Sequence, residues 1–305
     1  MSALPIETPT ASATHRESTV TFGRLAEMKR AGDPIVMVTA YDHPSAEVAQ
    51  NAGVDLILVG DSAAMVVLGH SSTVPITMNE MIMLCSAVRR GAATPLIIGD
   101  MPFGSYESSN ETAVMNAQRF IKEAGCDAVK LEGGGTSVER ARAIVGAGIP
   151  VMGHVGLTPQ TAAALGGFKA QGRTAAAAEK VIRDAQALEE AGCFSVVVEA
   201  VPAAVGEELT KRLGIPTIGI GAGRDTDGQV LVYHDLLGLR DGPNAKFVKR
   251  YADLRGEAIA AVTTYSDEVR AGIYPGPEHV YSIEPSELSE LRETLGSINT
   301  PADER

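Results

Sequence analysis

The sequence predicts an α/β protein built as a single-domain (β/α)8 barrel, the TIM-barrel class, and three observations carry this prediction. Eight short runs of apolar, mostly β-branched residues recur along the chain, and several are nearly continuous, as expected for strands covered on both faces. Each run is followed by a polar or glycine-rich loop and then by an Ala-, Leu- and Glu-rich stretch typical of a helix. Eight such units in about 250 residues fit the arithmetic of this barrel.

The expected strands follow one another at intervals long enough for a helix between each pair. They cover residues 35–40, 56–61, 96–101, 128–133, 151–156, 195–200, 217–222 and 231–236. An open doubly wound sheet also alternates strands and helices. Its dinucleotide-binding signature, G-x-G-x-x-G after the first strand, is missing here because that strand leads into AYDHPSAEV. The closed barrel is therefore favoured.

Helix boundaries are indicated by capping patterns. Capping-box spacing predicts three helix starts, at Thr77–Glu80, Ser108–Glu111 and Thr136–Glu139. Helix ends are expected beside glycines that can adopt a positive φ, namely Gly53, Gly91, Gly125, Gly148, Gly192 and Gly214.

The barrel is predicted to occupy residues 18–281 as the catalytic domain, with accessory segments at both ends. Residues 1–17 are rich in Ser, Thr and Pro and are expected to form a disordered or extended arm. Residues 282–305 are expected to form an acidic C-terminal tail with one short helix in EPSELSELRETLG.

Composition excludes several classes of function. The chain has 38 acidic residues against 26 Lys and Arg, a net charge of −12, and no Trp, which argues against nucleic-acid binding. No apolar run approaches the roughly 20 residues that span a bilayer, so no membrane partner is expected. The three cysteines form no C-x-x-C motif and fit a reducing cytoplasm better than a disulfide framework.

In a parallel barrel the active site is built at the carboxyl ends of the strands, and ionisable residues recur there in this sequence. Asp61 and Asp100 each follow a glycine at the end of an aliphatic run, as VGD and IGD. Two carboxylates that converge with Glu132 on one rim suit Mg²⁺, which takes few protein oxygens and keeps positions for substrate. The alternative is that each aspartate caps the loop or helix that follows.

Lys130 and Glu132 lie two residues apart on one expected strand, so both side chains point to the same face. If that face is the barrel interior, Lys130 can neutralise a substrate carboxylate or a developing enolate. Glu132 can then complete the surroundings of the metal directly or through water. An interior ion pair that satisfies itself is the structural alternative.

Two further strand-end residues are candidates for proton chemistry. Glu199 ends the apolar run VVVEA, where a lone carboxylate suits a general base, although a structural salt bridge is the simpler alternative. His154, in GHVGLTPQ, is a candidate hydrogen-bond donor in the site or, equally, a satisfied core histidine.

Ten segments of the chain resemble the ketopantoate hydroxymethyltransferase family, in order and at familiar spacings from about residue 18 to residue 281. They are TAYD (39–42), LVGDSAAM (58–65), GHSSTVPITMNEM (69–81), GDMPFGSY (99–106), VKLEGG (129–134), GHVGLTPQ (153–160), GGFKAQGR (166–173), VEAVP (198–202), IGIGAGRDTDGQVLVYHDLLG (218–238) and YPGPEHVY (274–281). Any one of these motifs is weak, but the series is specific.

The resemblance implies roles for the same strand-end residues. It implies that Asp61 and Asp100 ligate Mg²⁺ and that Glu132 is the third acid near the metal, acting directly or through water. It also implies that Ser62 and Lys130, together with the two aspartates, hold a 2-oxo acid substrate.

The resemblance further implies the reaction. A hydroxymethyl group would pass from 5,10-methylenetetrahydrofolate, the co-substrate, to 3-methyl-2-oxobutanoate, giving 2-dehydropantoate through a magnesium-stabilised enolate. Glu199 would accept the proton that leaves C3 of the oxo acid. Members of this family assemble as homo-oligomers, often decamers, so the same self-association is expected here.

Two alternatives stand beside this interpretation. The first is a magnesium-dependent, enolate-forming lyase or mutase of the isocitrate lyase type. Those lyases use a cysteine in a K-K-C-G-H-type loop, whereas here the segment before GHVG reads GIPVMGH, without a cysteine. The second is a non-catalytic barrel, which would not be expected to retain all four strand-end acids.

Overall fold

The computed structural model describes residues 19–242 and 245–298 and contains a closed barrel of eight parallel strands in chain order, with the last strand pairing with the first. The predicted (β/α)8 architecture is therefore confirmed. The strands are β1 (Ile35–Thr39), β2 (Leu56–Val59), β3 (Leu96–Asp100), β4 (Ala128–Lys130), β5 (Val151–Gly156), β6 (Ser195–Glu199), β7 (Thr217–Ile220) and β8 (Gly228–Leu231).

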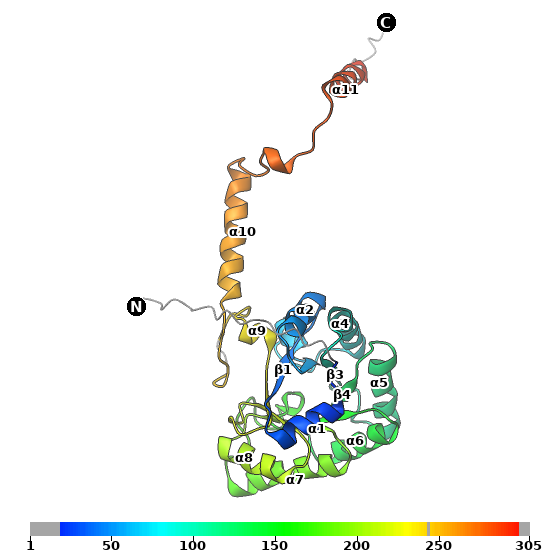
Figure 1. Ribbon diagram of the computed structural model, residues 1–305, viewed down its shortest axis with the longest axis vertical. Coiled ribbons are helices and arrows are strands. Elements are labelled where there is room, and N and C mark those ends of the chain that lie inside the picture. The colour runs from blue at the N-terminus through cyan, green and yellow to red at the C-terminus, as the bar shows by residue number, and fades with distance from the viewer. Residues whose placement is uncertain (1–18, 243–244, 299–305) are drawn as a thin grey trace, which may run out of the picture. The chain divides into compact units, whose positions relative to one another are not determined.

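Helices surround the strands, as Figure 1 shows for α2, α4, α5, α6, α7 and α8. The helical segments of the barrel are α1 (Phe22–Ala31), α2 (His43–Asn51), α3 (Ala63–Val66), α4 (Met78–Gly91), α5 (Asn110–Lys122), α6 (Thr136–Gly146), the 3-10 turn η1 (Pro159–Thr161), α7 (Ala175–Glu190), α8 (Ala203–Arg212) and α9 (Tyr233–Leu236).

The core has two layers, as the alternation of side chains along barrel strands requires. The outer layer packs strand residues such as Ile57 and Ile97 against the surrounding helices. The inner layer fills the amino-terminal half of the barrel with residues such as Leu56 and Ile98, and α1 adds Leu25 to it. Because apolar side chains close that half, the space for a ligand lies at the carboxyl ends of the strands.

The eighth strand lies earlier in the chain than expected. Residues 231–236 were expected as a strand, but the strand covers Gly228–Leu231, and Tyr233–Leu236 form helix α9. Pairing with Ile35–Val38 of β1 fixes this register. The chain turns out of the sheet after it, where the Tyr233 N–H donates to Thr39 Oγ1 at 2.9 Å.

Capping follows the prediction at one helix and departs from it at two. Thr77 and Glu80 form the expected capping box at α4. Helix α5 is capped by Ser109, one residue later than expected, because its hydroxyl accepts the N–H of Thr112. Helix α6 has Gly135 at its N-cap and no side-chain cap, so the predicted role of Thr136 is wrong.

The glycine prediction holds at four of its six positions. Positive φ angles occur at Gly53, Gly125, Gly148 and Gly192. Gly91 instead is the last residue of α4, where a Cβ would collide with the carbonyl oxygen of His43. Its absent side chain therefore permits close packing of α4 against α2, rather than a turn.

The chain divides into two compact units, residues 1–252 and residues 253–305. The second unit contains α10 (Leu254–Arg270), the 3-10 turn η2 (Pro277–His279) and α11 (Pro285–Ile298), and α11 lies over the segment EPSELSELRETLG in which a short helix is expected. The expected boundary at residue 281 remains a prediction, and the arm expected over residues 1–17 lies outside the described residues. Among the helices that the structure describes, none combines the length and apolar character needed to span a membrane.

Candidate active site

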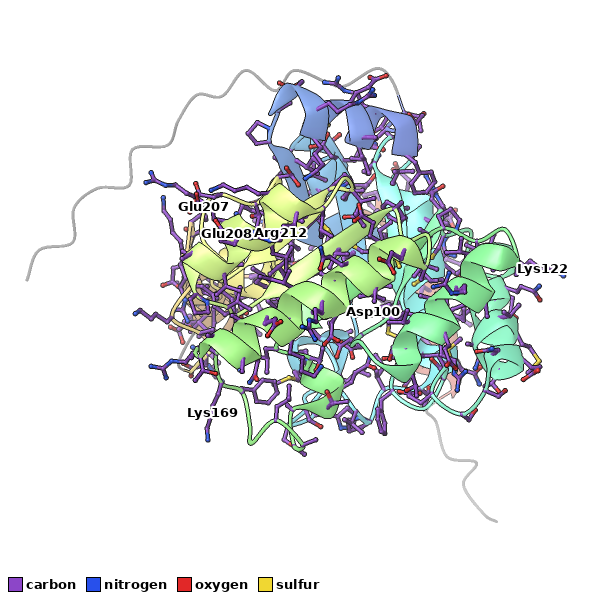
Figure 2. All side chains as sticks on the ribbon, turned by 90° about the horizontal axis from the view of Figure 1, so that it is seen from below. Asp100, Lys122, Lys169, Glu207, Glu208 and Arg212 are labelled. Atoms are coloured by element: carbon purple, nitrogen blue, oxygen red, sulfur yellow. The ribbon has the colours of Figure 1, made fainter. Side chains whose placement is uncertain are left out.

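A cavity of about 210 Å³ opens at the carboxyl ends of the strands. All the site residues predicted from the sequence line it: Asp61, Ser62, Asp100, Lys130, Glu132, His154 and Glu199. Figure 2 shows Asp100 near the centre of the barrel, whereas Lys122 and Glu207 lie on helices at its periphery. These seven residues lie in the carboxyl-terminal parts of five successive strands, β2 to β6, or in the loops directly after them, so the closed topology brings them together.

Asp61 and Asp100 lie side by side at the ends of β2 and β3. The backbone N–H of Asp61 donates to Asp100 Oδ2 at 3.0 Å, and both side chains are buried. Burial, followed by the charges of Asp100 and Glu132, raises the pKa of Asp61 well above its ordinary value. Burial also raises the pKa of Asp100. A cation bound between these two carboxyl groups would stabilise the ionised form of both.

Lys130 supplies positive charge to this acidic end of the barrel. Its Nζ lies 2.8 Å from Asp100 Oδ1 and 3.4 Å from Glu132 Oε1, inside the barrel. Burial alone would lower the pKa of Lys130, but the carboxylates of Asp100, Glu132 and Asp61 raise it overall. The side chain is therefore a buried cation at neutral pH, and Lys130 and Glu132 share the interior face as predicted.

Glu132, His154 and Glu199 form a continuous chain of charged groups. His154 Nδ1 lies 3.1 Å from Glu132 Oε1, and His154 Nε2 lies 3.2 Å from Glu199 Oε2. Burial would raise the pKa of Glu132, but Lys130 and His154 lower it to about 2. Burial and Lys130 would lower the pKa of His154, but the two glutamates raise it to about 9. His154 is thus a cation between two carboxylates, hydrogen-bonded to Glu132 through Nδ1, whereas its Nε2 lies near Glu199 without hydrogen-bond geometry. Glu199 is therefore paired in charge rather than alone.

Glu199 is more accessible to solvent than the other two residues of this group, Glu132 and His154. Its side chain is 15% exposed, against 3% or less for those of Glu132 and His154. It therefore reaches the open part of the cavity, while Glu132 and His154 lie behind it. Ser62 also lines the cavity, and its Oγ is 2.9 Å from the hydroxyl oxygen of Tyr41.

Gln160 and Tyr106 belong to the site but are not indicated by position at a strand end, although both lie in segments that carry the family resemblance. Gln160 lies in η1 after β5, and Tyr106 in the loop after β3. Gln160 Nε2 donates to Asp61 Oδ2 at 3.0 Å, and its backbone N–H donates to Glu132 Oε2 at 3.0 Å. Tyr106 donates its hydroxyl proton to Gln160 Oε1 at 2.6 Å. Both residues are uncharged loop residues, so neither burial of charge nor strand position marked them.

The donor set fits a small, hard divalent cation with few protein ligands. In the described part of the chain, no three His, Cys, Asp or Glu side chains are arranged to hold one ion together. Both oxygens of Glu132 are already engaged, by His154 and by the N–H of Gln160. Asp100 Oδ1 is buried and accepts no hydrogen bond of suitable geometry, although Lys130 Nζ lies near it. Asp61 and Asp100 thus match the habit of Mg²⁺, which takes one or two carboxylates and keeps several waters.

Other ionisable residues near the strand ends have structural partners. Asp42 forms the capping box of α2 with Ser45. His234 packs its ring against Tyr41, with centroids 5.4 Å apart, and Asp235 lies 3.8 Å from Arg240 at the edge of the cavity.

Comparison with known proteins identifies close relatives. Residues 19–277 match the family model described as ketopantoate hydroxymethyltransferase. The 3-methyl-2-oxobutanoate hydroxymethyltransferase of Moorella thermoacetica is 58% identical over 266 residues, which cover 87% of this chain and 99% of that protein. The mitochondrial 3-methyl-2-oxobutanoate hydroxymethyltransferase 1 of Arabidopsis thaliana is 55% identical over 277 residues, covering 88% of this chain and 80% of that protein.

Solved structures of lower sequence similarity share the fold. A phosphonopyruvate hydrolase, solved in complex with oxalate and Mg²⁺, superposes with a TM-score of 0.57 at 13% identity and covers 94% of this chain and 100% of that one. A 2,3-dimethylmalate lyase of the PEP mutase/isocitrate lyase superfamily gives a TM-score of 0.54 at 17% identity, over 92% and 98% of the two chains. At these identities the likeness concerns the fold alone.

The fold and the charged cavity at the carboxyl ends of its strands define an enzyme of the (β/α)8-barrel class. The chain belongs to the ketopantoate hydroxymethyltransferase family, and it is a hydroxymethyltransferase. Neither the lyase alternative nor the non-catalytic barrel is therefore retained.

Proposed function

We propose that this enzyme transfers a hydroxymethyl group from 5,10-methylenetetrahydrofolate to 3-methyl-2-oxobutanoate, giving 2-dehydropantoate and tetrahydrofolate. One observation carries the proposal: two buried aspartates, a buried lysine and a Glu132–His154–Glu199 chain all line one cavity in a member of this family. These groups are the ones needed to bind a 2-oxo acid and to remove a proton beside its keto group.

Asp61 and Asp100 are the proposed ligands of Mg²⁺, and Glu132 is the third acid, acting through water. When bound, the ion supplies a Lewis acid for the carboxylate and keto oxygens of the oxo acid. The adjacent positions of the two aspartates and the raised pKa of each support this assignment. The engaged oxygens of Glu132 favour the indirect role over direct ligation.

Lys130 and Ser62 are proposed to hold the oxo acid beside the two aspartates. Lys130 remains protonated among three carboxylates, so it stabilises negative charge that develops on the substrate. The hydroxyl of Ser62 lies at the cavity wall beside that of Tyr41, where it can donate to a substrate oxygen.

Glu199 is the proposed base for the C3 proton of the oxo acid. The electron pair of the broken C–H bond forms the enolate, whose C3 then bonds to the methylene carbon of the folate. The bonds from that carbon to the folate nitrogens break, and one water supplies the oxygen of the new hydroxymethyl group. His154 Nε2 lies 3.2 Å from Glu199 Oε2 and holds this carboxylate in place at the cavity.

The proposal extends to the assembly and location of the protein. We expect a homo-oligomer, with a decamer as the predicted size, in the cytoplasm. Helix α10 supports self-association, because it has no buried side chain and exposes Ile259, Val262 and Val269. Apolar side chains in such positions are commonly covered by another surface.

The test is turnover of 3-methyl-2-oxobutanoate by the purified full-length protein with 5,10-methylenetetrahydrofolate and Mg²⁺. The expected result is formation of 2-dehydropantoate together with tetrahydrofolate. Absence of product under these conditions would overturn the proposal, as would release of glyoxylate from 2-methylisocitrate as the main activity.

A further inference from the structure

We propose that Gln160 is a positioning residue that fixes the orientation of the Asp61 carboxylate for the divalent cation. This inference rests on the proposed function, because it concerns the same metal site. Gln160 is 5% exposed and lies in the 3-10 turn η1 after β5. It is within hydrogen-bond distance of Asp61, which follows β2, and of Glu132, which follows β4.

The side-chain amide of Gln160 makes three hydrogen bonds. Nε2 donates to Asp61 Oδ2 at 3.0 Å and to the carbonyl oxygen of Met101 at 2.9 Å. Oε1 accepts the hydroxyl proton of Tyr106 at 2.6 Å. A primary amide has two donors and one acceptor oxygen, so these contacts use both donors and leave no rotational freedom without loss of a bond.

Tyr106 determines which way the amide faces. The backbone N–H of Glu132 donates to the Tyr106 hydroxyl oxygen at 3.2 Å. Because that N–H occupies the oxygen as an acceptor, the hydroxyl proton is free to point to Gln160 Oε1. The amide nitrogen must then face Asp61, where the carboxylate oxygen accepts.

The same residue reaches a second acid through its backbone. The Gln160 N–H donates to Glu132 Oε2 at 3.0 Å, so one loop residue contacts acids from the ends of β2 and β4. Side-chain substitution leaves this backbone bond in place. A variant at position 160 therefore tests the contact with Asp61 separately from the contact with Glu132.

Partners of this kind govern metal affinity, because they set the orientation of the ligand before the ion arrives. With Oδ2 of Asp61 held by Gln160, the carboxylate cannot rotate freely in the cavity. Loss of the amide would leave a buried carboxylate oxygen without its donor and free to turn toward Lys130 or away from Asp100. The cation would then meet a ligand that must be reoriented on binding.

The experiment is a titration of the full-length protein with Mn²⁺ alone, followed by electron paramagnetic resonance of the free ion, without either substrate. Gln160→Met, which keeps the length of the side chain and removes its hydrogen bonds, should weaken Mn²⁺ binding about 10–100-fold. Gln50→Met is the matched control. Gln50 accepts the N–H groups of Ala93 and Thr94 before β3, at the other end of the barrel, so its loss should leave Mn²⁺ affinity unchanged.

The outcomes separate this inference from the proposed function. If the wild-type protein binds Mn²⁺ and Gln160→Met binds it equally well, Gln160 only supports the loop and the inference is wrong. If the wild-type protein does not bind Mn²⁺, the proposed metal site itself is overturned. Should Gln160→Met fail to fold, Tyr106→Phe decides the matter, because it removes only the hydroxyl that orients the amide. Weaker Mn²⁺ binding by Tyr106→Phe supports the inference, and unchanged binding contradicts it.

Discussion

Asp100 and Lys130 are paired residues of neighbouring strands, and their side chains form a buried ion pair with Nζ 2.8 Å from Oδ1. Parallel pairing of β3 with β4 places both side chains at the same height in the barrel. The lysine thereby lies between Asp100 and Glu132, at the floor of the cavity. Its charge offsets part of the repulsion among three acids that the site requires.

Removing the lysine should destabilise the fold, because its loss leaves buried carboxylates without their counterion. Lys130→Met is expected to lower the free energy of unfolding by about 3–5 kcal/mol, measured by urea denaturation. Lys180→Met is the control, since Lys180 pairs with Asp184 on the exposed surface of α7 and should contribute less than about 1 kcal/mol. An equal decrease in the free energy of unfolding for both variants would show that the buried ion pair contributes no more to stability than the exposed one.

The proposed metal ligands can be tested by binding. Asp61→Asn and Asp100→Asn should each weaken magnesium-dependent binding of the oxo acid by more than about 100-fold, because a ligand should matter more than the residues that support it. Isothermal titration calorimetry with and without Mg²⁺ measures this. Asp127→Asn is the control, because Asp127 binds Arg89 and the N–H of Ile97 at the amino end of the strands. Unchanged magnesium titrations in both site variants would refute the ligand assignment.

The capping box of α4 predicts a pH-dependent contribution to stability. Hydrogen bonds from the backbone and side chain of Thr77 lower the pKa of Glu80. Because folding lowers the pKa of this carboxyl group, its ionised form stabilises the fold at pH values above its ordinary pKa. This contribution to the free energy of unfolding is lost as the pH falls through the lowered pKa. Thr77→Ala should therefore cost about 1 kcal/mol at pH 7, and less toward pH 4.

Helix α7 offers the control for this measurement. Its N-cap, Thr174, bonds the N–H of Ala177, so no carboxylate takes part in the cap. The penalty of Thr174→Ala in urea denaturation should thus stay constant between pH 7 and pH 4. A Thr77→Ala penalty that grows on acidification would contradict the interpretation.

The thiols are expected to be inert in the native protein. Cys85, Cys126 and Cys193 are all free and buried, and burial raises the pKa of Cys193 to about 12. At pH 8 the Cys193 side chain is therefore a thiol rather than the thiolate, which is the reactive form. Ellman's reagent should label no cysteine before unfolding and all three in guanidinium chloride. Rapid labelling of the native protein would show that one of these sites opens readily.

Much of the site followed from the sequence because strand ends carry a clear signal. Asp61 and Asp100 each end an apolar run, and a charged residue in that position needs a partner or a ligand. The barrel then fixes where such residues meet. Lys130 and Glu132 shared a face because alternate residues of a strand do so.

Sequence patterns do not predict those features of the site and the fold that tertiary contacts determine. Gln160 acts through its loop, which has no periodic pattern, and its partners lie 99 residues away at Asp61 and 28 residues away at Glu132. The eighth strand lies earlier in the chain than predicted, although LVYHDL has the apolar pattern of a strand. Pairing with β1 instead selected the less apolar Gly228–Leu231.

The most direct test of the central claim is exchange of the C3 proton of 3-methyl-2-oxobutanoate in deuterated water, followed by proton nuclear magnetic resonance. With Mg²⁺ present and the folate omitted, the wild-type enzyme should exchange this proton. Glu199→Gln should slow the exchange by about 10²–10⁴-fold while binding the oxo acid normally. Exchange at the wild-type rate by Glu199→Gln would contradict the assignment of Glu199 as the base.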